Sequence, residues 1–386
     1  MQVPELRFKE FNDEWQLKKL NEIANIYDGT HQTPKYTKSG VPFVSVEDIK
    51  NIYGTTKFIS KDDFQKNFKI KPQKNDILMT RIGDVGTPAI VKNDNDIAFY
   101  VSLSLIKFVK QYIYIYIYIY IYQYIFTPYF KKELHNKILH VAFPKKINLT
   151  DIGKCKVFLP SSKEQTKIAD FLSLIDRKIE LQEKLVENLK LYKKGLLKKV
   201  FSNNLGWKSA KLGDFLISSD KTPVEDTSKY KKLTVKLNLQ GLEENIIKRT
   251  MLDTRPFYIR HQGEIIIGKQ NYFNGSIAIV SEKFDNYICS NAIMSFSISN
   301  ANTYFIYYQI SQSDYINKRS YMANGTGQKE LSEKDFLNFD IKIPSIEEQN
   351  RIANLFTSLD KKIELETKKL QDLKTYKKGL LQKMFI

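Results

Sequence analysis

Side chains that could contact a nucleic acid occur on predicted turns in both halves of the sequence. Arg and Lys can bind guanine edges or phosphates, and Asn and Gln can bind adenine edges. In the first half the candidates for DNA contact are Lys35, Tyr36, Lys38, Thr80 and Arg81. In the second half they are Lys221, Lys231, Lys232, Lys269, Gln270, Asn271 and Gln328. For any one of them, a solvated surface position is the competing interpretation.

One segment resembles the phosphate-binding loop of ATPases in its spacing, and its chemistry argues against that function. Residues 263–270 read GEIIIGKQ. The last position of such a loop needs Ser or Thr to hold magnesium, and here it is Gln270. The four residues after Gly263 have the composition of a strand, whereas a phosphate-binding loop must present backbone amides. A P-loop ATPase is therefore disfavoured, and a measurement of ATP binding to the isolated chain would test it.

Other catalytic constellations are missing from the sequence. It has neither a Rossmann-type glycine loop nor an Asn-Pro-Pro-Tyr-like methyltransferase tetrad. Cys155 and Cys289 have no CxxC partner and are expected to be free buried thiols. No two histidines have the spacing of metal ligands; they are His31, His135, His140 and His261. We predict a chain that is not an enzyme and that holds no metal or cofactor.

The charge balance favours a polyanionic partner. The 386 residues include 61 Lys and Arg against 43 Asp and Glu, a formal net charge of +18. The basic residues are spread along the chain, which fits a broad surface lying along DNA better than a flexible arm. A lysine-rich soluble protein is the competing interpretation. The N-terminus has no apolar signal region, and we expect a cytoplasmic protein without a membrane segment.

An internal repeat organises the chain. Residues 160–201 recur as residues 344–385, each copy with Pro-Ser at its start and a Glu three residues after the Ser. This pattern predicts a capping box followed by a heptad-patterned helix, roughly 60 Å long at 1.5 Å per residue. Such a helix cannot bury its apolar seam on a compact domain, so we expect the two copies to pack antiparallel. A generic coiled-coil stalk would not need the same sequence twice.

The segments around the repeats predict two globular domains of similar α/β fold. Short strands separated by polar turns are expected at 41–46, 77–80 and 88–91. The second half retraces the first, because residues 74–81 align with 262–269 and 86–91 with 275–280. We therefore expect globular domains at 1–160 and 203–343, and long helices at 161–202 and 344–386, related by a pseudo-twofold repeat.

Residues 112–122 alternate Tyr and Ile without a break. The period of two is that of a strand, but a helix start is also open, and the segment is too short for a membrane helix. A TA dinucleotide tract encodes this alternation, which suggests slippage and phase-variable expression of the gene. A single invariant repeat length in a clonal population would contradict that hypothesis.

These motifs together resemble the DNA-specificity subunit of type I restriction-modification systems. The resemblance rests on EQ-x-x-IA, D-x-KIEL and YKKGLL in both repeats, on Trp15 and Trp207 ahead of the globular halves, and on GTGQKEL at 325–331. It covers the whole chain. One departure is that the first half has AFPKKINL at 142–149 instead of GTGQKEL.

The resemblance implies two target-recognition domains that are separated by two long antiparallel coiled-coil helices, each domain reading one half of a bipartite site on double-stranded DNA. The helices would set the spacer and dock two methyltransferase subunits, joined by endonuclease/translocase subunits. S-adenosylmethionine, ATP and Mg would belong to those partners. Our candidates for partner contact are Glu164, Gln165, Tyr192, Lys193, Glu348, Gln349, Tyr376 and Lys377. For Glu164 and Gln165, completion of the helix cap is the competing role.

Two alternatives stay open from the sequence. One is the recognition subunit of a different methyltransferase-linked restriction enzyme. The other is a coiled-coil scaffold that binds DNA without sequence specificity, whose binding would vanish with salt.

Overall fold

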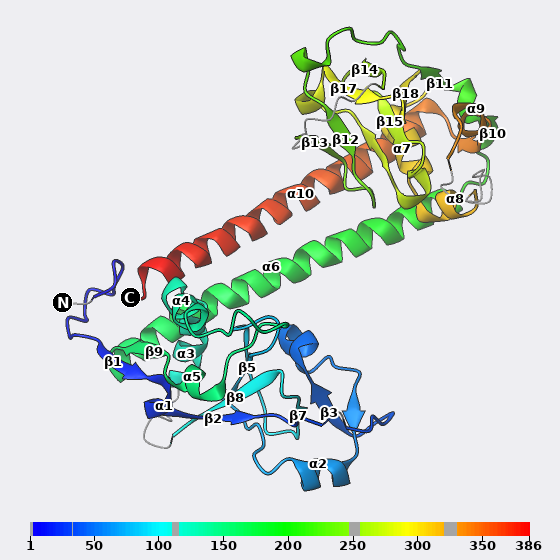
Figure 1. Ribbon diagram of the computed structural model, residues 1–386. Helices are drawn as coiled ribbons and strands as arrows, with labels where there is room; N and C mark the ends of the chain where they lie inside the picture. The colour runs from blue at the N-terminus through cyan, green and yellow to red at the C-terminus, as the bar shows by residue number, and fades with distance from the viewer. Residues whose placement is uncertain (1–2, 33, 110–115, 247–254, 320–329) are drawn as a thin grey trace. The chain divides into compact units, whose positions relative to one another are not determined.

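The computed structural model describes residues 3–32, 34–109, 116–246, 255–319 and 330–386. The chain divides into two compact units (Figure 1), one made of Met1–Glu183 with Lys368–Ile386 and the other of Lys184–Thr367. Each unit combines a globular part with a segment of each of two long helices, α6 (Ser162–Ser202) and α10 (Ile346–Lys383). Among the helices of these ranges, none combines the length and the apolar character that crossing a bilayer requires.

The globular part of the first unit is built on an antiparallel four-stranded sheet in the order β2-β8-β5-β6. A three-stranded sheet, β4-β3-β7, and a two-stranded pair, β1-β9, complete its strands. The strands are β1 (Gln16–Lys19), β2 (Ala24–Asp28), β3 (Val41–Val44), β4 (Phe58–Ile59), β5 (Ile77–Thr80), β6 (Pro88–Ile90), β7 (Ala98–Phe99), β8 (Leu103–Phe108) and β9 (Lys156–Leu159). The helices are α1 (Leu20–Ile23), α2 (Lys61–Asn67), α3 (Ile117–Ile125), α4 (Pro128–His135) and α5 (Leu149–Gly153).

The second unit repeats the main sheet as β11-β18-β15-β16 and the pair as β10-β19. Two further pairs, β12-β13 and β14-β17, complete its strands, and Lys232 next to β12 bridges in parallel to Ile288 of β17, as β3 pairs in parallel with β7 in the first unit. The strands are β10 (Lys208–Lys211), β11 (Leu216–Ser218), β12 (Leu233–Val235), β13 (Leu242–Glu244), β14 (Phe257–Arg260), β15 (Ile265–Gly268), β16 (Ile277–Ile279), β17 (Tyr287–Ser290), β18 (Ile293–Ile298) and β19 (Asp340–Ile343). The helices are α7 (Thr303–Ile310), α8 (Ser313–Asn317) and α9 (Glu333–Leu337).

The two main sheets correspond strand by strand, which confirms that the halves share one fold. In the first, Ile77 of the central strand β5 lies opposite Ile106 on one side and Ile90 on the other. In the second, Ile265 of β15 lies opposite Phe296 and Ile279. Both central strands are buried along their whole length, because apolar clusters cover both faces of each sheet.

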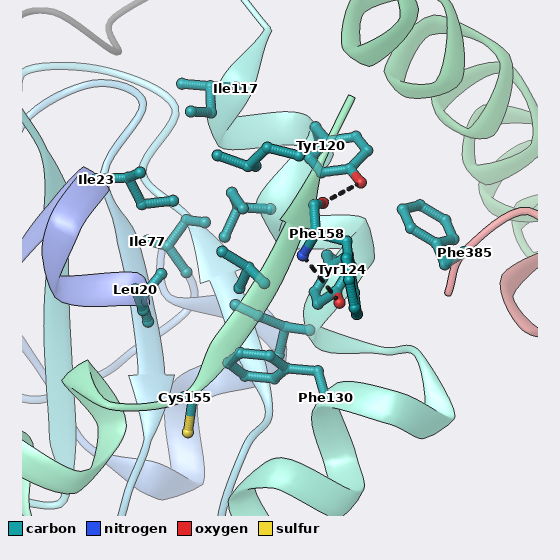
Figure 2. Close-up of a cluster of buried hydrophobic side chains, with 14 of the residues drawn as sticks. Leu20, Ile23, Ile77, Ile117, Tyr120, Tyr124, Phe130, Cys155, Phe158 and Phe385 are labelled. Atoms are coloured by element: carbon teal, nitrogen blue, oxygen red, sulfur yellow. Dashed lines mark hydrogen bonds between the residues drawn. The ribbon is translucent and has the colours of Figure 1, made fainter. Parts of the chain in front are cut away.

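The part of the Tyr-Ile tract that the structure describes is helical. Residues 110–115 lie outside the described residues, and Ile117–Ile125 forms α3. The helix places Ile117, Tyr120, Ile121 and Tyr124 on one buried face (Figure 2). The Tyr120 hydroxyl donates to the carbonyl oxygen of Phe158 at 2.7 Å, and the Phe158 amide donates to the Tyr124 hydroxyl at 3.2 Å. Tertiary packing against β9 therefore overrides the strand period of the sequence.

Within each unit the two long helices run antiparallel. In the first, Asp176 and Glu183 of α6 pair with Lys377 and Lys374 of α10 in reversed order. In the second, Lys193 pairs with Asp360, and Phe201 stacks on Phe356 with ring centroids 6.4 Å apart. Short 3-10 helices lie at Val46–Asn51, Leu212–Asp214, Thr227–Lys229, Tyr272–Asn274 and Glu282–Phe284.

Candidate nucleic-acid interface

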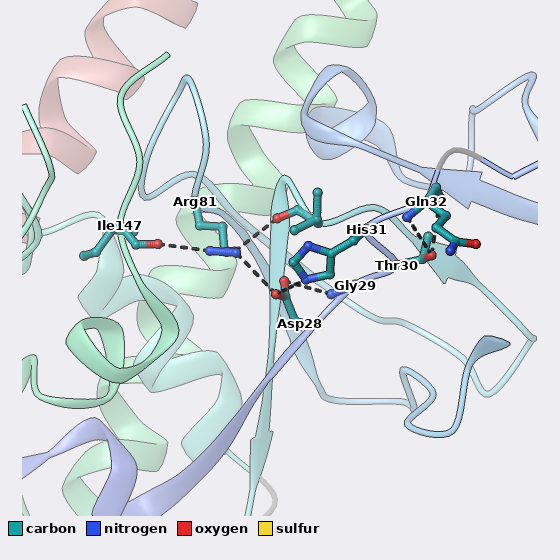
Figure 3. Close-up of polar contacts among 8 residues, drawn as sticks. Asp28, Gly29, Thr30, His31, Gln32, Arg81 and Ile147 are labelled. Atoms are coloured by element: carbon teal, nitrogen blue, oxygen red, sulfur yellow. Dashed lines mark hydrogen bonds and ion pairs between the residues drawn. The ribbon is translucent and has the colours of Figure 1, made fainter. Parts of the chain in front are cut away.

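Arg81 connects three loop segments of the first unit (Figure 3). Its Nε donates to the Val101 carbonyl at 3.0 Å, its Nη1 to the Ile147 carbonyl at 3.2 Å, and its Nη2 to Asp28 Oδ2 at 3.3 Å. His31 lies on the other side of the same carboxylate, with its Nε2 2.8 Å from Asp28 Oδ2. The Arg81–Asp28 pair therefore fixes the start of the polar loop that follows β2.

The structure places Thr80 and Arg81, two of the predicted DNA contacts, in the interior and not on an exposed turn. Both are buried, and the Thr80 hydroxyl accepts a hydrogen bond from the Thr87 amide at 2.9 Å. Their polar groups hold the turns at the end of β5, which is a positioning role, and DNA contact by either residue stays a prediction. Sequence reasoning saw polar residues on a turn but had no signal for the partners at Asp28 and Ile147.

The other candidates of the first unit are on the surface. Lys35, Tyr36 and Lys38 are exposed on the loop between β2 and β3. Tyr36 packs edge-on against Phe43 with ring centroids 5.7 Å apart, which orients its ring while leaving the side chain accessible. His31 and Gln32 on the same loop are exposed as well and were missed as candidates. Two lysines at the end of a neighbouring loop, Lys145 and Lys146, are also exposed.

An ion pair positions the corresponding loop of the second unit. Lys221 Nζ lies 2.9 Å from both carboxylate oxygens of Glu333 at the start of α9, and Ser218 also donates to Glu333. Burial acts to raise the pKa of Glu333, but the hydrogen bonds from Ser218 and Lys221 outweigh it and lower that pKa. A pocket of about 380 Å³ opens beside this loop and is lined by Asp220, Thr222, Lys229, Tyr230 and His261 among others.

The turn after β15 carries three candidates of the second unit, two of them exposed. Gln270 and Asn271 are exposed, and Lys269 is half-buried. Gln328 lies outside the described residues. At the domain's other candidates, Lys231 pairs with Glu244 at 3.2 Å, and Lys232 lies over the Phe257 ring at 4.2 Å from its centroid. These contacts orient the two lysines without burying Lys231.

Ile147 of AFPKKINL and Leu331 of GTGQKEL lie at matching places in the two folds. The Ile147 amide donates to the Arg81 carbonyl at 3.0 Å, and the Leu331 amide donates to the Lys269 carbonyl at 3.0 Å. Both segments are therefore joined to the turn after the central strand, although their sequences differ. The departure seen in the sequence therefore leaves this attachment unchanged, and residues 325–329 lie outside the described residues.

Most of the residues predicted to bind partners make contacts within the chain. Gln165 Nε2 donates to the Pro160 carbonyl at 2.8 Å, and Gln349 Nε2 to the Pro344 carbonyl at 3.0 Å, so both glutamines stabilise helix starts. The amides of Glu164 and Glu348 are capped by Ser161 and Ser345 at 3.4 Å. Their carboxylates do not complete the expected capping boxes: Glu164 binds Arg7, and Glu348 binds Arg351.

Lys193 and Lys377 stand where the heptad pattern would place an apolar residue. In the structure each of them pairs with an aspartate of the other long helix. Lys377 lies 2.5 Å from Asp176, and Lys193 lies 2.5 Å from Asp360. These aspartates were missed as functional residues, although the D-x-KIEL motif repeats them. Tyr192 and Tyr376, in contrast, are more than half exposed and stay candidates for partner contact.

Among the residues that the structure describes, no cluster of His, Cys, Asp or Glu has the geometry of a metal site. Cys155 and Cys289 are free and buried, as the sequence predicts, and burial raises the pKa of Cys155 to about 12. The site therefore offers hydrogen-bonding and cationic groups on loops. Such groups can bind bases and phosphates.

Comparison with known proteins identifies the family. The model of the type I restriction modification DNA specificity domain matches residues 12–191 and 204–375. The chain is 25% identical over 426 residues to the Methanocaldococcus jannaschii protein named as the type I restriction enzyme MjaX specificity subunit, covering 96% of this chain and 93% of that protein.

Two solved structures share the fold. One is the S subunit of a type I restriction-modification system from M. genitalium, with a TM-score of 0.64 at 16% identity over 100% of this chain and 99% of that one. The other belongs to a study of complex assembly and conformational transition of the type I R-M system, with a TM-score of 0.54 at 12% identity over 96% and 97%. The chain therefore belongs to the family of type I restriction modification DNA specificity domains, of which it carries two, and is a specificity subunit of such a system.

Proposed function

We propose that each globular part reads one half of a bipartite site on double-stranded DNA and that the paired helices set the spacer between the halves. One observation carries this proposal: the same sheet, β2-β8-β5-β6 and β11-β18-β15-β16, is built twice with different surface loops. A repeated scaffold with different loops is what two readers of different DNA words need.

The exposed and half-buried candidates on those loops supply the contacts. Lys35, Tyr36 and Lys38 serve the first word, and Lys269, Gln270 and Asn271 serve the second. Lysines bind phosphates or guanine, and the amides of Gln and Asn bind adenine. The net charge of +18 supports the sequence-independent part of the affinity.

The proposal also includes an assembly. Two methyltransferase subunits dock along the helices, with the exposed Tyr192 and Tyr376 as contact candidates, and endonuclease/translocase subunits join them. The chain itself is non-catalytic, and S-adenosylmethionine, ATP and Mg serve the partner subunits. DNA recognition of this kind takes place where the chromosome lies, so the proposed site of action is the cytoplasm.

A selection experiment tests the two-reader proposal. The chain, in complex with its methyltransferase subunits, is used to select duplexes from a random library at moderate salt, and the bound pool is sequenced. Two short words at a fixed separation are expected. Substitution of Gln270 and Asn271 by Ala should relax only one word, whereas Lys208→Ala, an exposed lysine on strand β10, serves as the control and should relax neither. Enrichment without any word would favour the non-specific scaffold.

A further inference from the structure

An N-terminal arm, residues 3–13, covers one face of α6 in the first unit. We call this the covered face; it consists of Glu164, Lys167 and Phe171. Arg7 donates from Nε and Nη2 to the two carboxylate oxygens of Glu164, both at 2.7 Å, and the Glu164 side chain is 1% exposed. Such a bidentate contact is among the strongest that a carboxylate can make.

Aromatic and charged contacts complete this arrangement. Phe8 packs edge-on against Phe171 with ring centroids 6.0 Å apart, and Lys167 Nζ lies 4.8 Å from the centroid of the Phe8 ring. Lys167 also pairs with Glu10 of the arm. The covered face therefore recognises three features of the arm: an arginine, an aromatic residue directly after it and an acid two positions further on.

The repeat places the same chemistry on α10. Glu348, Arg351 and Leu355 stand 184 residues after Glu164, Lys167 and Phe171, and we call them the open face. Each face has a glutamate, a basic residue and an apolar residue at positions i, i+3 and i+7, which lie on one side of a helix. On the open face, however, the Glu348 side chain is 34% exposed, Arg351 is 77% exposed, and Leu355 is 44% exposed.

The architecture explains why the second unit does not supply its own arm. Trp15 and Trp207 occupy matching places, and each packs on a phenylalanine that ends a repeat: Trp15 on Phe385 and Trp207 on Phe201. In the second unit the chain before Trp207 is the end of α6 itself, with Phe201 in the core. In the first unit the phenylalanine that packs on the tryptophan is Phe385, which follows α10. The residues directly before Trp15 are therefore not part of a long helix and are available as an arm.

We propose that the open face is a docking site for a segment of a partner polypeptide with the chemistry of the arm, an arginine followed by an aromatic residue and then an acid. The partner's arginine takes the Glu348 carboxylate, its aromatic ring covers Leu355, and its acid pairs with Arg351. Arg351 now pairs with Glu348 at 2.7 Å and would exchange this partner for the incoming acid, as Lys167 pairs with Glu10. The inference goes beyond the proposed reading of DNA and needs neither DNA nor enzyme activity.

A labelled peptide with the sequence of residues 3–13 is the probe, and its fluorescence anisotropy is followed on titration with the full chain. Binding is expected, and Leu355→Asp and Glu348→Gln should each weaken it at least tenfold. The matched controls are Asn354→Asp, which adds the same charge one residue away, and Glu347→Gln, which neutralises the neighbouring exposed glutamate. Neither control should change the affinity, and circular dichroism checks that every variant keeps its helix content.

Two further variants show which face the peptide occupies. With Arg7→Ala and Phe8→Ala combined, the arm is weakened, so the number of peptides bound per chain should rise from one toward two. Binding that is lost with Glu164→Gln but kept with Leu355→Asp would mean exchange with the arm at the covered face and would overturn the proposal. Dimerisation of the chain that Leu355→Asp abolishes would also overturn it, because a second copy would then be the occupant.

Discussion

Lys377 Nζ lies 2.5 Å from Asp176 Oδ1, so that inside the first unit the last turns of α10 are joined to the first half of α6. The counterpart one repeat away, Lys193 with Asp360, makes the same contact inside the second unit. Each aspartate also receives a group from its globular part: Gln123 Nε2 donates to Asp176 at 2.7 Å, and the Tyr308 hydroxyl donates to Asp360 at 2.7 Å. The same lysine–aspartate contact thus connects the helix pair to the globular part in both units. The group that the globular part donates differs: Gln123 in the first unit and Tyr308 in the second.

Lys377→Ala should destabilise the protein by about 1 kcal/mol, because Asp176 loses its cationic partner in a partly buried site where Gln123 also donates to it. Lys378→Ala is the matched control, since Lys378 is exposed on the next position of the same helix. Urea unfolding of both variants measures the difference. Equal midpoints for the two variants would mean that the joint contributes nothing to stability.

Tyr120→Phe should lower the free energy of unfolding by about 1–3 kcal/mol, because it removes the donor to a buried carbonyl of Phe158. Tyr118→Phe, in the same tract but only partly buried, should change the stability little. Thermal unfolding of the pair checks the assignment of α3. A larger loss from Tyr118→Phe would show that the helix docks in another register.

The contribution of the Lys221–Glu333 ion pair to the free energy of unfolding should depend on pH. The folded-state pKa of Glu333 is lowered, so its stabilising effect is complete above the unfolded-state pKa of about 4.3 and is lost as the pH falls through the folded-state value. Glu333→Gln should therefore be less stable than the wild type at pH 7, and the two should converge near the acid limit. An equal difference at both pH values would contradict the pairing.

Both thiols should be unreactive in the folded protein at pH 8. Burial raises the pKa of Cys155 to about 12 and also raises that of Cys289, so almost no thiolate forms, and neither sulfur is accessible. A colorimetric thiol reagent should label neither cysteine until denaturant is added, and both afterwards. Rapid labelling of Cys289 without denaturant would indicate that the β14-β17 pair opens readily.

The architecture could be predicted from the sequence because the internal repeat shows directly that the two halves are alike. The helices, their caps at Ser161 and Ser345, and the shared fold all follow from residues that occur twice. The site was harder to predict, because polarity on a turn does not reveal burial. The sequence does not show that Arg81 is buried, because one of its hydrogen-bond partners, Ile147, is 66 residues away in the chain.

Long-range pairing also explains the other differences. Glu164 was assigned to a cap or a partner, but its carboxylate binds Arg7, 157 residues earlier in the sequence. The Tyr-Ile tract has the period of a strand, and only the docking of Tyr120 and Tyr124 on Phe158 selects the helix. In each case a tertiary contact that no local pattern encodes decided the role of the residue.

The most direct test of two readers and a helical ruler is a methylome. The chain is co-expressed with a candidate methyltransferase subunit, and modified bases are mapped across a host chromosome by single-molecule sequencing. The account predicts two short words around a fixed unspecified spacer, with loop substitutions in one unit changing one word only. A single continuous word, or changes in both words from substitutions in one unit, would contradict it.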